Sequence, residues 1–229
     1  MPALNFDSWD WRGAEEDYRR AITLNPNNAG AHDALGWLLD DIGRLEEGWK
    51  ESQLAQQLDP NHNHLYYALY KRREYDRAIK LNLTMLESDP NSGYLHSQLY
   101  ESYSAKGMYK EAVQHLEQVV ILFGFPEEAP NLRRAFAASG YAGAMREWAK
   151  ELERLYASNQ VFMPVNLAAT YAALGDKDRA FYWLKEGYKH RGRSSAGVDM
   201  ADLKVYRGLD PLRSDPRFVD LVRRMGLPP

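Results

Sequence analysis

Cysteine is missing from this chain of 229 residues, and several kinds of site are excluded with it. Disulfides, cysteine nucleophiles and cysteine-ligated zinc sites all require a thiol. An excess of charge of one sign is also lacking, since 29 Lys and Arg stand against 32 Asp and Glu. The formal net charge of -3 provides no overall attraction to nucleic-acid phosphates or to an anionic membrane. We therefore expect neither a nucleic-acid partner nor a membrane partner.

Long apolar runs are absent from the sequence as well. No run approaches the roughly 18–20 residues that cross a bilayer, and residues 1–17 have neither a basic start nor a long apolar segment. The hydrophobic share of 45% is nevertheless ordinary for a folded domain. These features predict a cytoplasmic protein that is stabilised by packing.

Motifs for metal, nucleotide or acid–base chemistry are scarce. His62 and His64 lie two residues apart, but a metal site needs further ligands, and we interpret this pair as part of a solvated turn. The stretch GRSSAG at 192–197 lacks the Gly-Lys-Ser/Thr ending of a phosphate-binding loop, which indicates a simple connection. The adjacent carboxylates Asp40 and Asp41 have no evident catalytic partner. We expect no metal, no cofactor and no enzymatic activity.

An internal repeat is what the sequence does contain. Small residues recur at Ala78, Ala112, Ala144 and Ala180, with spacings of 34, 32 and 36 residues. The step from Gly48 to Ala78 is only 30 residues, so one repeat is short by about one helical turn. A period in this range is typical of solenoid proteins, in which each repeat is one small structural unit.

Each unit has the pattern of two helices joined by a tight turn. Ala168 and Tyr171 fall on one face of a predicted helix. Gly175 ends that helix, because glycine adopts a left-handed backbone conformation at little cost. The apolar face of the second helix carries four residues, namely Ala180, Tyr182, Trp183 and Leu184. Such a pair cannot bury its apolar faces alone, so successive pairs must stack, and the alanines mark points where helix backbones approach closely.

These residues resemble the tetratricopeptide repeat. The shared features are the 34-residue period, a Leu-Gly or Leu-Ala pair, a small residue early in the second helix and a proline after it. Gly48 and Ser52 depart from the pattern, where the family usually has alanine and an aromatic residue. The resemblance implies an all-α, right-handed superhelix (α-solenoid) of about six helical hairpins with a C-terminal capping helix. Its structural positions are Leu35, Gly36, Ala78, Ala112, Ala144, Ala168, Tyr171, Gly175 and Ala180.

We expect a single domain over 1–229. Its parts are a partial first repeat (1–28), repeat 2 (29–62), a shortened repeat 3 (63–92), repeat 4 (93–124), repeat 5 (125–160), repeat 6 (161–190), and a linker with the C-terminal cap (191–229). We expect Ser214 to be the N-cap of the capping helix and Pro216 to lie in its first turn.

The two ends of the sequence suggest a wider context. The partial first repeat leads us to expect a piece of a longer protein. The last repeat and cap look similar to the closing segment of tetratricopeptide regions in bacterial signalling proteins, namely winged-helix regulators, adenylate cyclases and Ser/Thr kinases. The resemblance thus implies a regulatory setting for this chain.

The same resemblance implies a concave groove lined by the first helix of each pair. Aromatic residues mixed with carboxylates would suit a peptide with apolar anchors and a positive charge. The Lys/Asn clamp of the chaperone-binding subgroup is missing, which argues against a C-terminal carboxylate as ligand. The alternative for many of these aromatic residues is burial between helices. The predicted groove residues are Asp33, Trp37, Asp40, Tyr66, Tyr70, Tyr94, Ser97 and Glu101.

Three functions follow as hypotheses. The first is a protein–protein interaction scaffold that binds a peptide or partner protein in the groove. The second is a ligand-sensing domain with a compact pocket lined by Trp37, Tyr66 and Tyr70. The third is a homodimer formed through the N-terminal face, where the incomplete first repeat leaves apolar side chains without a covering helix; these are Leu4, Phe6, Trp9 and Trp11.

Overall fold

All regular structure in the described part of the chain is helical, as the sequence predicts. The computed structural model describes residues 9–59, 65–190 and 198–228, which contain α-helices and two short 3-10 helices and no strand. His62, His64 and the stretch 192–197 lie outside the described residues. The helices are α1 (Trp11–Leu24), α2 (Ala29–Asp41), α3 (Leu45–Leu58), α4 (Leu65–Lys71), α5 (Tyr75–Ser88), α6 (Gly93–Ala105), α7 (Tyr109–Leu122), α8 (Glu128–Ala157), α9 (Pro164–Ala173), α10 (Lys177–Lys189), η1 (Met200–Lys204), η2 (Arg207–Leu212) and α11 (Pro216–Arg224).

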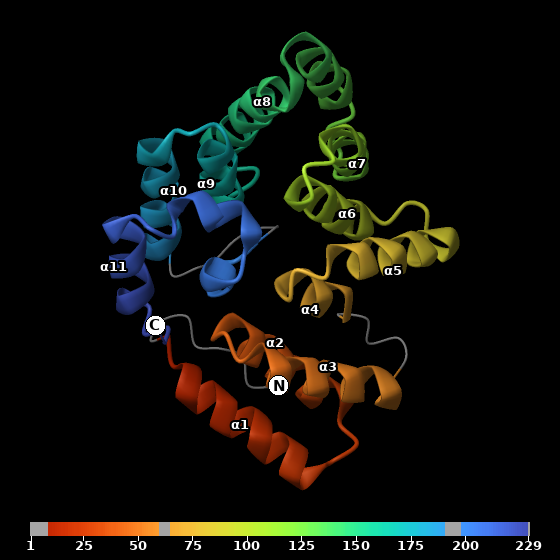
Figure 1. Ribbon diagram of the computed structural model, residues 1–229, viewed down its shortest axis with the longest axis vertical. Helices are drawn as coiled ribbons and strands as arrows, with labels where there is room; N and C mark the ends of the chain where they lie inside the picture. The colour runs from red at the N-terminus through yellow and green to blue at the C-terminus, as the bar shows by residue number, and fades with distance from the viewer. Residues whose placement is uncertain (1–8, 60–64, 191–197, 229) are drawn as a thin grey trace.

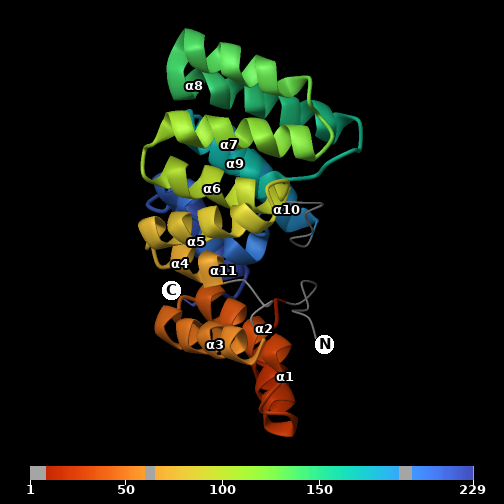
Figure 2. The same cartoon turned by 90° about the vertical axis from the view of Figure 1, so that its right-hand side faces the viewer.

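The helices stack in chain order into an arc. Figure 1 shows the arc running from α1 through α2 to α7, turning at α8 and returning through α9 and α10 to α11. In the side view, α3, α5, α7 and α8 lie one above another (Figure 2). Consecutive helices form the main contacts, as expected when each pair buries its apolar face against the next. This arrangement is consistent with an α-solenoid.

The described helices fall in pairs within the predicted segments. Segments 29–62, 93–124 and 161–190 each contain two helices, while 1–28 contains only α1. In 125–160 the single long α8 is interrupted at Ser139 and Gly140, whose backbone angles are not helical, so it also supplies two helical halves. In 63–92 the first helix, α4, has 7 residues where α2 and α6 have 13.

Left-handed residues close the turns inside the pairs. Gly43, Gly107 and Gly175 have φ values of 88°, 73° and 78°, each just after the first helix of a pair. In the shortened pair Arg73 takes this place with φ 64°. The predicted role of Gly175 is therefore confirmed, and Asp176 caps α10 by accepting a hydrogen bond from the backbone N–H of Arg179.

The predicted small positions of the repeat lie in the core. Ala78, Ala112, Ala144, Ala168 and Ala180 are all fully buried. The assignment of Tyr182 to the buried face was wrong, because its side chain is 52% exposed. Its neighbours on both sides, Phe181 and Trp183, are the buried aromatic residues of α10.

The departures at Gly48 and Ser52 reflect a close contact between α2 and α3. A Cβ atom on Gly48 would lie 2.2 Å from Oδ1 of Asp40 and 2.8 Å from the backbone oxygen of Gly36. A Cβ atom on Gly36 would lie 2.6 Å from Oγ of Ser52. The side-chain volumes of these residues therefore complement one another: the missing Cβ of Gly48 leaves the space that the Asp40 carboxyl group occupies.

Gly48→Ala should therefore destabilise the protein, although it restores the residue usual in the resembled family. Alanine improves helix propensity by roughly 0.5–1 kcal/mol over glycine, but overpacking costs about 1–3 kcal/mol and should outweigh it. Urea denaturation would measure the loss. Gly93→Ala serves as control, since its Cβ would meet no atom closer than 3.2 Å. A Gly48→Ala variant as stable as wild type would contradict the close contact.

The C-terminal segment closes the arc against α1. The indole N–H of Trp11 donates to the backbone oxygen of Met225 at 2.6 Å, and Arg217 pairs with Asp178 of α10 at 2.7 Å. Pro216 lies in the first turn of α11 as predicted, but the N-cap is Asp215 and the expectation of Ser214 was wrong. The Asp215 carboxylate accepts from the backbone N–H of Arg217, the contact that defines the cap.

The expectation of an uncovered N-terminal face is also wrong within the described residues. Trp9 and Trp11 are only 8% and 7% exposed. Trp9 stacks on Trp11 and on Tyr188 of α10, with centroid separations of 5.9 and 6.5 Å. For Trp9 and Trp11, the chain's own C-terminal half supplies the cover that a second subunit was expected to provide. Leu4 and Phe6 lie outside the described residues.

Candidate functional site

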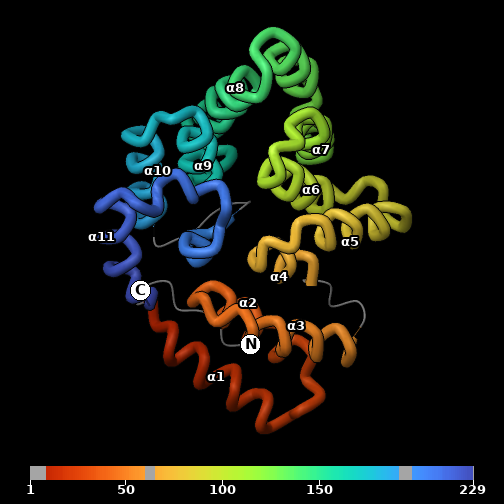
Figure 3. The backbone as a smooth tube through the Cα atoms, viewed as in Figure 1, coloured from red at the N-terminus to blue at the C-terminus, as the bar shows by residue number. Residues whose placement is uncertain are grey.

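The concave side of the arc holds a segment of the chain itself. The short helix η1 packs on α2 and α10, and η2 packs on α9 and α6. The tube in Figure 3 shows this stretch inside the arc. Four side chains anchor it, each with 0% exposure: Met200, Leu203, Leu209 and Leu212. The groove predicted to be open along the first helices is therefore partly filled.

A buried ion cluster fixes this segment to the first half of the arc. Nζ of Lys71, at the end of α4, lies 2.5 Å from Oδ1 of Asp41 and 3.1 Å from Oδ1 of Asp202. Burial alone would lower the pKa of Lys71, but the two carboxylates raise it above its usual value. Burial, opposed by Lys71, raises the pKa of Asp41. The ammonium group also lies 4.8 Å from the ring centre of Trp37 in α2. Side chains from α2, α4 and η1 therefore all contact the Lys71 ammonium group.

Two cavities remain between the inner segment and the helices. The large cavity, of ≈ 450 Å³, has an apolar wall from α7 and α8, to which Leu116, Val119 and Leu152 contribute. The small cavity has ≈ 240 Å³. The two share four lining residues: Tyr100, Glu101, Trp148 and Asn166. These shared residues form the centre of the candidate site.

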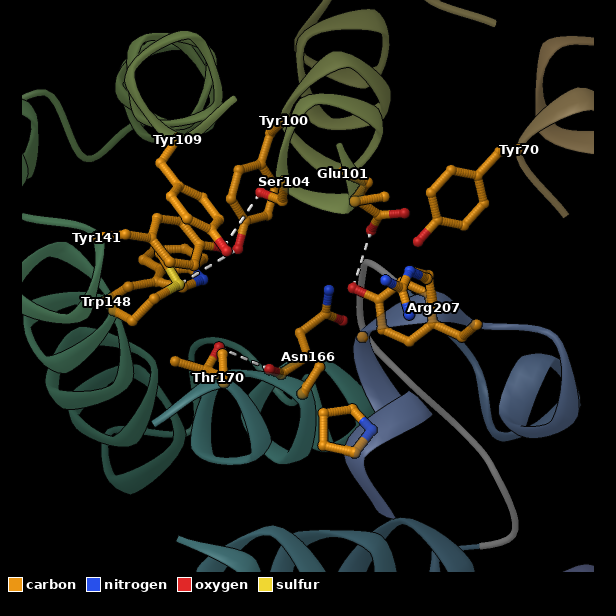
Figure 4. Close-up of a pocket in the computed structure, with 17 residues that line it drawn as sticks. Tyr70, Tyr100, Glu101, Ser104, Tyr109, Tyr141, Trp148, Asn166, Thr170 and Arg207 are labelled. Carbon is orange, nitrogen blue, oxygen red and sulfur yellow. Dashed lines mark hydrogen bonds between the residues drawn. The ribbon is translucent and has the colours of Figure 1, made fainter. Parts of the chain in front are cut away.

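Aromatic side chains converge on the small cavity. Figure 4 shows Tyr70 from α4, Tyr100 from α6 and Tyr141 and Trp148 from α8 arranged around it. Two of their hydroxyl groups bond within the protein. The Tyr141 hydroxyl lies 3.1 Å from that of Ser104, and the Tyr100 hydroxyl donates to the sulfur of Met145 at 3.6 Å. The rings are thus held by packing and hydrogen bonds from several repeats.

Glu101 is the carboxyl group that the described linings of the two cavities share. Its side chain is 7% exposed, and Oε1 accepts a hydrogen bond from the Tyr206 hydroxyl at 3.3 Å. Oε2 is buried without any hydrogen-bond partner. Burial and then the nearby Asp202 raise the pKa of Glu101 to about 8, while the Tyr206 hydroxyl opposes this rise. A buried carboxyl group with one unused acceptor therefore faces the site.

The predicted groove residues divide between the cavities and the core. Trp37, Tyr94, Ser97 and Glu101 line the large cavity, and Tyr70 lines the small one beside Glu101. The other three predicted groove residues line neither cavity and are buried, namely Asp33, Asp40 and Tyr66. The structure thus brings together five of the eight, around two partly enclosed cavities rather than along one continuous groove.

Several lining residues were missed by sequence reasoning. The sequence placed Tyr100 and Trp148 in predicted helices of the repeats. Whether their side chains point into a cavity depends on the packing angle between repeats, which the sequence does not specify. Nothing in the sequence indicated a cavity position for Asp199, Asp202 and Tyr206, because no local pattern predicts that residues 198–212 pack inside the arc. Among the described residues, no group of three or more His, Asp or Glu side chains is placed to hold a metal ion.

Stability should fall as the pH rises from 6.5 to 8. Burial raises the pKa of Asp40 to about 7 and that of Glu101 to about 8. In this window the folded protein holds protons that the unfolded chain has lost, so raising the pH favours unfolding. His115 acts oppositely, because burial and His96 lower its pKa to about 4, but its effect is confined below its usual value of 6.5.

Urea denaturation at pH 6.5 and pH 8 would measure this dependence. Glu101→Gln should reduce the loss of stability between the two pH values, since glutamine does not titrate. An exposed Glu87→Gln variant is the control and should behave as wild type. Equal stability at both pH values, or a rise, would contradict the assignment of raised pKa values.

Comparison with known protein families finds no family model that matches this chain. The resemblance to the tetratricopeptide repeat therefore stays a prediction. Among the described residues, no helix combines the length and the apolar character needed to cross a membrane.

Proposed function

We propose that this chain is a non-catalytic ligand-binding module of the tetratricopeptide type, which takes a small organic molecule into the large cavity. The observation that carries the proposal is the position of η1 and η2 on the concave side, where they and the repeat helices line partly enclosed cavities. A volume of ≈ 450 Å³ lies within the range of small-molecule pockets, roughly 300–1,000 Å³. A mostly apolar wall with a few polar groups is also typical of such sites.

The walls of the large cavity come from different parts of the chain, so a bound ligand would affect how those parts are held together. Asp199 and Asp202 belong to the returning segment, and they face helices of the repeats across the large cavity. This segment leads into α11, whose end contacts Trp11. A ligand that contacts both walls would favour the closed arc over any more open state. As part of the proposal, such a module would report occupancy to an attached domain of a larger bacterial regulator.

A cavity-filling variant tests the proposal. The full chain would be screened by thermal shift against a library of small organic compounds, with direct binding checked by calorimetry. Val119→Phe should abolish binding of the compounds that stabilise wild type, because Val119 lines the large cavity. Leu83→Phe adds the same ring at a side chain that is 42% exposed on α5 and should preserve binding. Binding that survives Val119→Phe, or no binding to wild type, would contradict the proposal.

A partner peptide or protein is the second candidate. Tyr94 and Phe123 line the large cavity and are also 44% and 53% exposed, so an apolar side chain of a partner could bind at this mouth. A Tyr94→Ala/Phe123→Ala variant should lose any such partner in affinity capture while retaining its circular dichroism spectrum. Trp37 is unsuitable for this test, since it packs against Lys71 and Tyr67.

A further inference from the structure

Glu101 presents an unused hydrogen-bond acceptor to the candidate site. Its side chain is more than nine-tenths buried, lines both cavities, and has no partner for Oε2. Buried polar atoms are nearly always paired, because removing them from water without a partner costs free energy. In Figure 4 the Glu101 carboxyl group extends into the space between Tyr70 and Tyr100. A donor on a ligand would satisfy this atom.

The charges around the site favour a positively charged donor. The described lining of the large cavity includes the carboxyl groups of Glu101, Asp199 and Asp202 but no Lys, Arg or His. Asp202 is partly balanced by Lys71. In the small cavity the one cationic residue among the described lining, Arg207, bonds to the carboxylate of Asp210. A cation on the ligand would therefore meet uncompensated acidic groups.

The rings around Glu101 are suited to the same kind of ligand. Tyr70 of α4, Tyr100 of α6 and Tyr206, the residue before η2, line the small cavity together with Glu101. The Tyr70 and Tyr206 ring centres lie 6.3 Å apart. The faces of aromatic rings attract cations, most strongly where water is excluded. The apolar wall of the large cavity continues directly from this point through Trp148.

We infer that Glu101 binds the protonated amine of a small organic ligand, whose apolar body lies in the large cavity. The ammonium group donates an N–H to Oε2. Its charge lowers the pKa of Glu101, so that the proton which the free protein holds at neutral pH is released to solvent and the carboxylate and ammonium charges balance within the buried site. This assignment rests on the proposed function and adds to it the chemical class of the ligand. Electrostatic pairing then supplies specificity, while the apolar wall supplies most of the contact area.

Two probes of the same shape and different head groups test this assignment. Binding of 4-phenylbutan-1-amine and of 4-phenylbutan-1-ol to the full chain would be measured by calorimetry at pH 9, above the pKa of about 8 of Glu101 and below that of the ammonium group. The amine should bind at least about tenfold more tightly than the alcohol, because a charge-assisted hydrogen bond is roughly twice as strong as a neutral one. Glu101→Gln should bring the two affinities within about threefold of each other, since its amide carries no charge.

Glu117→Gln is the matched control. Glu117 is 6% exposed, pairs with Arg133 and does not line either cavity, so its variant should retain the preference for the amine. Circular dichroism and thermal melts would confirm that both variants fold. Equal affinity of wild type for the two probes would overturn the cation site but leave the cavity as a binding site. An amine preference that survives Glu101→Gln would overturn the role of Glu101.

Failure of both probes to bind wild type would also overturn the inference. The compound screen with Val119→Phe then decides separately on the proposed function, because its library contains neutral molecules that do not require Glu101. The two experiments thus distinguish a cavity that takes neutral ligands from a cavity that takes none.

Discussion

Replacing Lys71 with alanine is expected to lower the free energy of unfolding by about 3–5 kcal/mol. The substitution removes the ammonium group that lies within 3.1 Å of both Asp41 and Asp202, and it leaves two carboxyl groups buried beside each other. Removing one partner of a buried ion pair costs more than the pair contributes, because the remaining charge cannot be solvated. Because Asp202 belongs to η1, the returning segment should also loosen. Urea denaturation and hydrogen exchange of residues 200–212 would measure the two effects.

Lys106→Ala is the control for this prediction. Lys106 pairs with Asp76, as Lys71 pairs with Asp41, and each aspartate precedes its lysine by 30 residues. The Lys106 pair is at the surface, however, with Asp76 85% exposed. Surface pairs contribute about 0–1 kcal/mol. A Lys71→Ala variant that loses no more stability than Lys106→Ala would show that the cluster does not hold the inner segment in place.

Trp11→Ala should cost a similar amount, about 3–5 kcal/mol, by opening the contact between the two ends of the arc. Trp11 is 7% exposed, stacks on Trp9 and donates to the backbone of Met225 across 214 residues. Loss of the ring removes both packing and the hydrogen bond. Thermal unfolding would measure the destabilisation, and limited proteolysis near residue 215 would report on the release of α11.

Two variants identify the source of this effect. Trp11→Phe retains a ring and should lose less, because it deletes the hydrogen bond while preserving much of the packing. Trp49→Ala removes a half-buried tryptophan that contacts Arg72 and Arg77, away from the closure, and should leave α11 in place. If Trp11→Ala and Trp49→Ala release α11 equally, the closure does not depend on Trp11.

The helical pairs could be predicted because their determinants are local. The turn at Gly175 depends on the conformational freedom of one residue, and it occurs where the sequence indicated. Ala112 and Ala180 recur at the repeat spacing, and both are fully buried. The error at Tyr182 has a physical reason: in this helix Phe181 and Trp183 already occupy the buried side, so the residue between them faces solvent.

The candidate site could be predicted only in part. Trp37 and Glu101 were placed on the inner side by the register of the repeats, and both line the large cavity. The same register placed Asp40 in a groove, but Asp40 instead occupies the space left by Gly48. A repeat register specifies which helix faces inward, whereas the side-chain volumes of neighbouring repeats decide which residues are covered.

The sequence by itself determined that this protein is helical, where most pairs begin and end, and which small residues lie at their contacts. These properties depend on helical periodicity and turn chemistry, which act over a few residues. Only the tertiary structure decided that residues 198–212 return into the arc and that Met225 meets Trp11. Contacts such as Lys71 with Asp202 join distant parts of the chain, and they form only because a curved stack of helices brings those parts within reach.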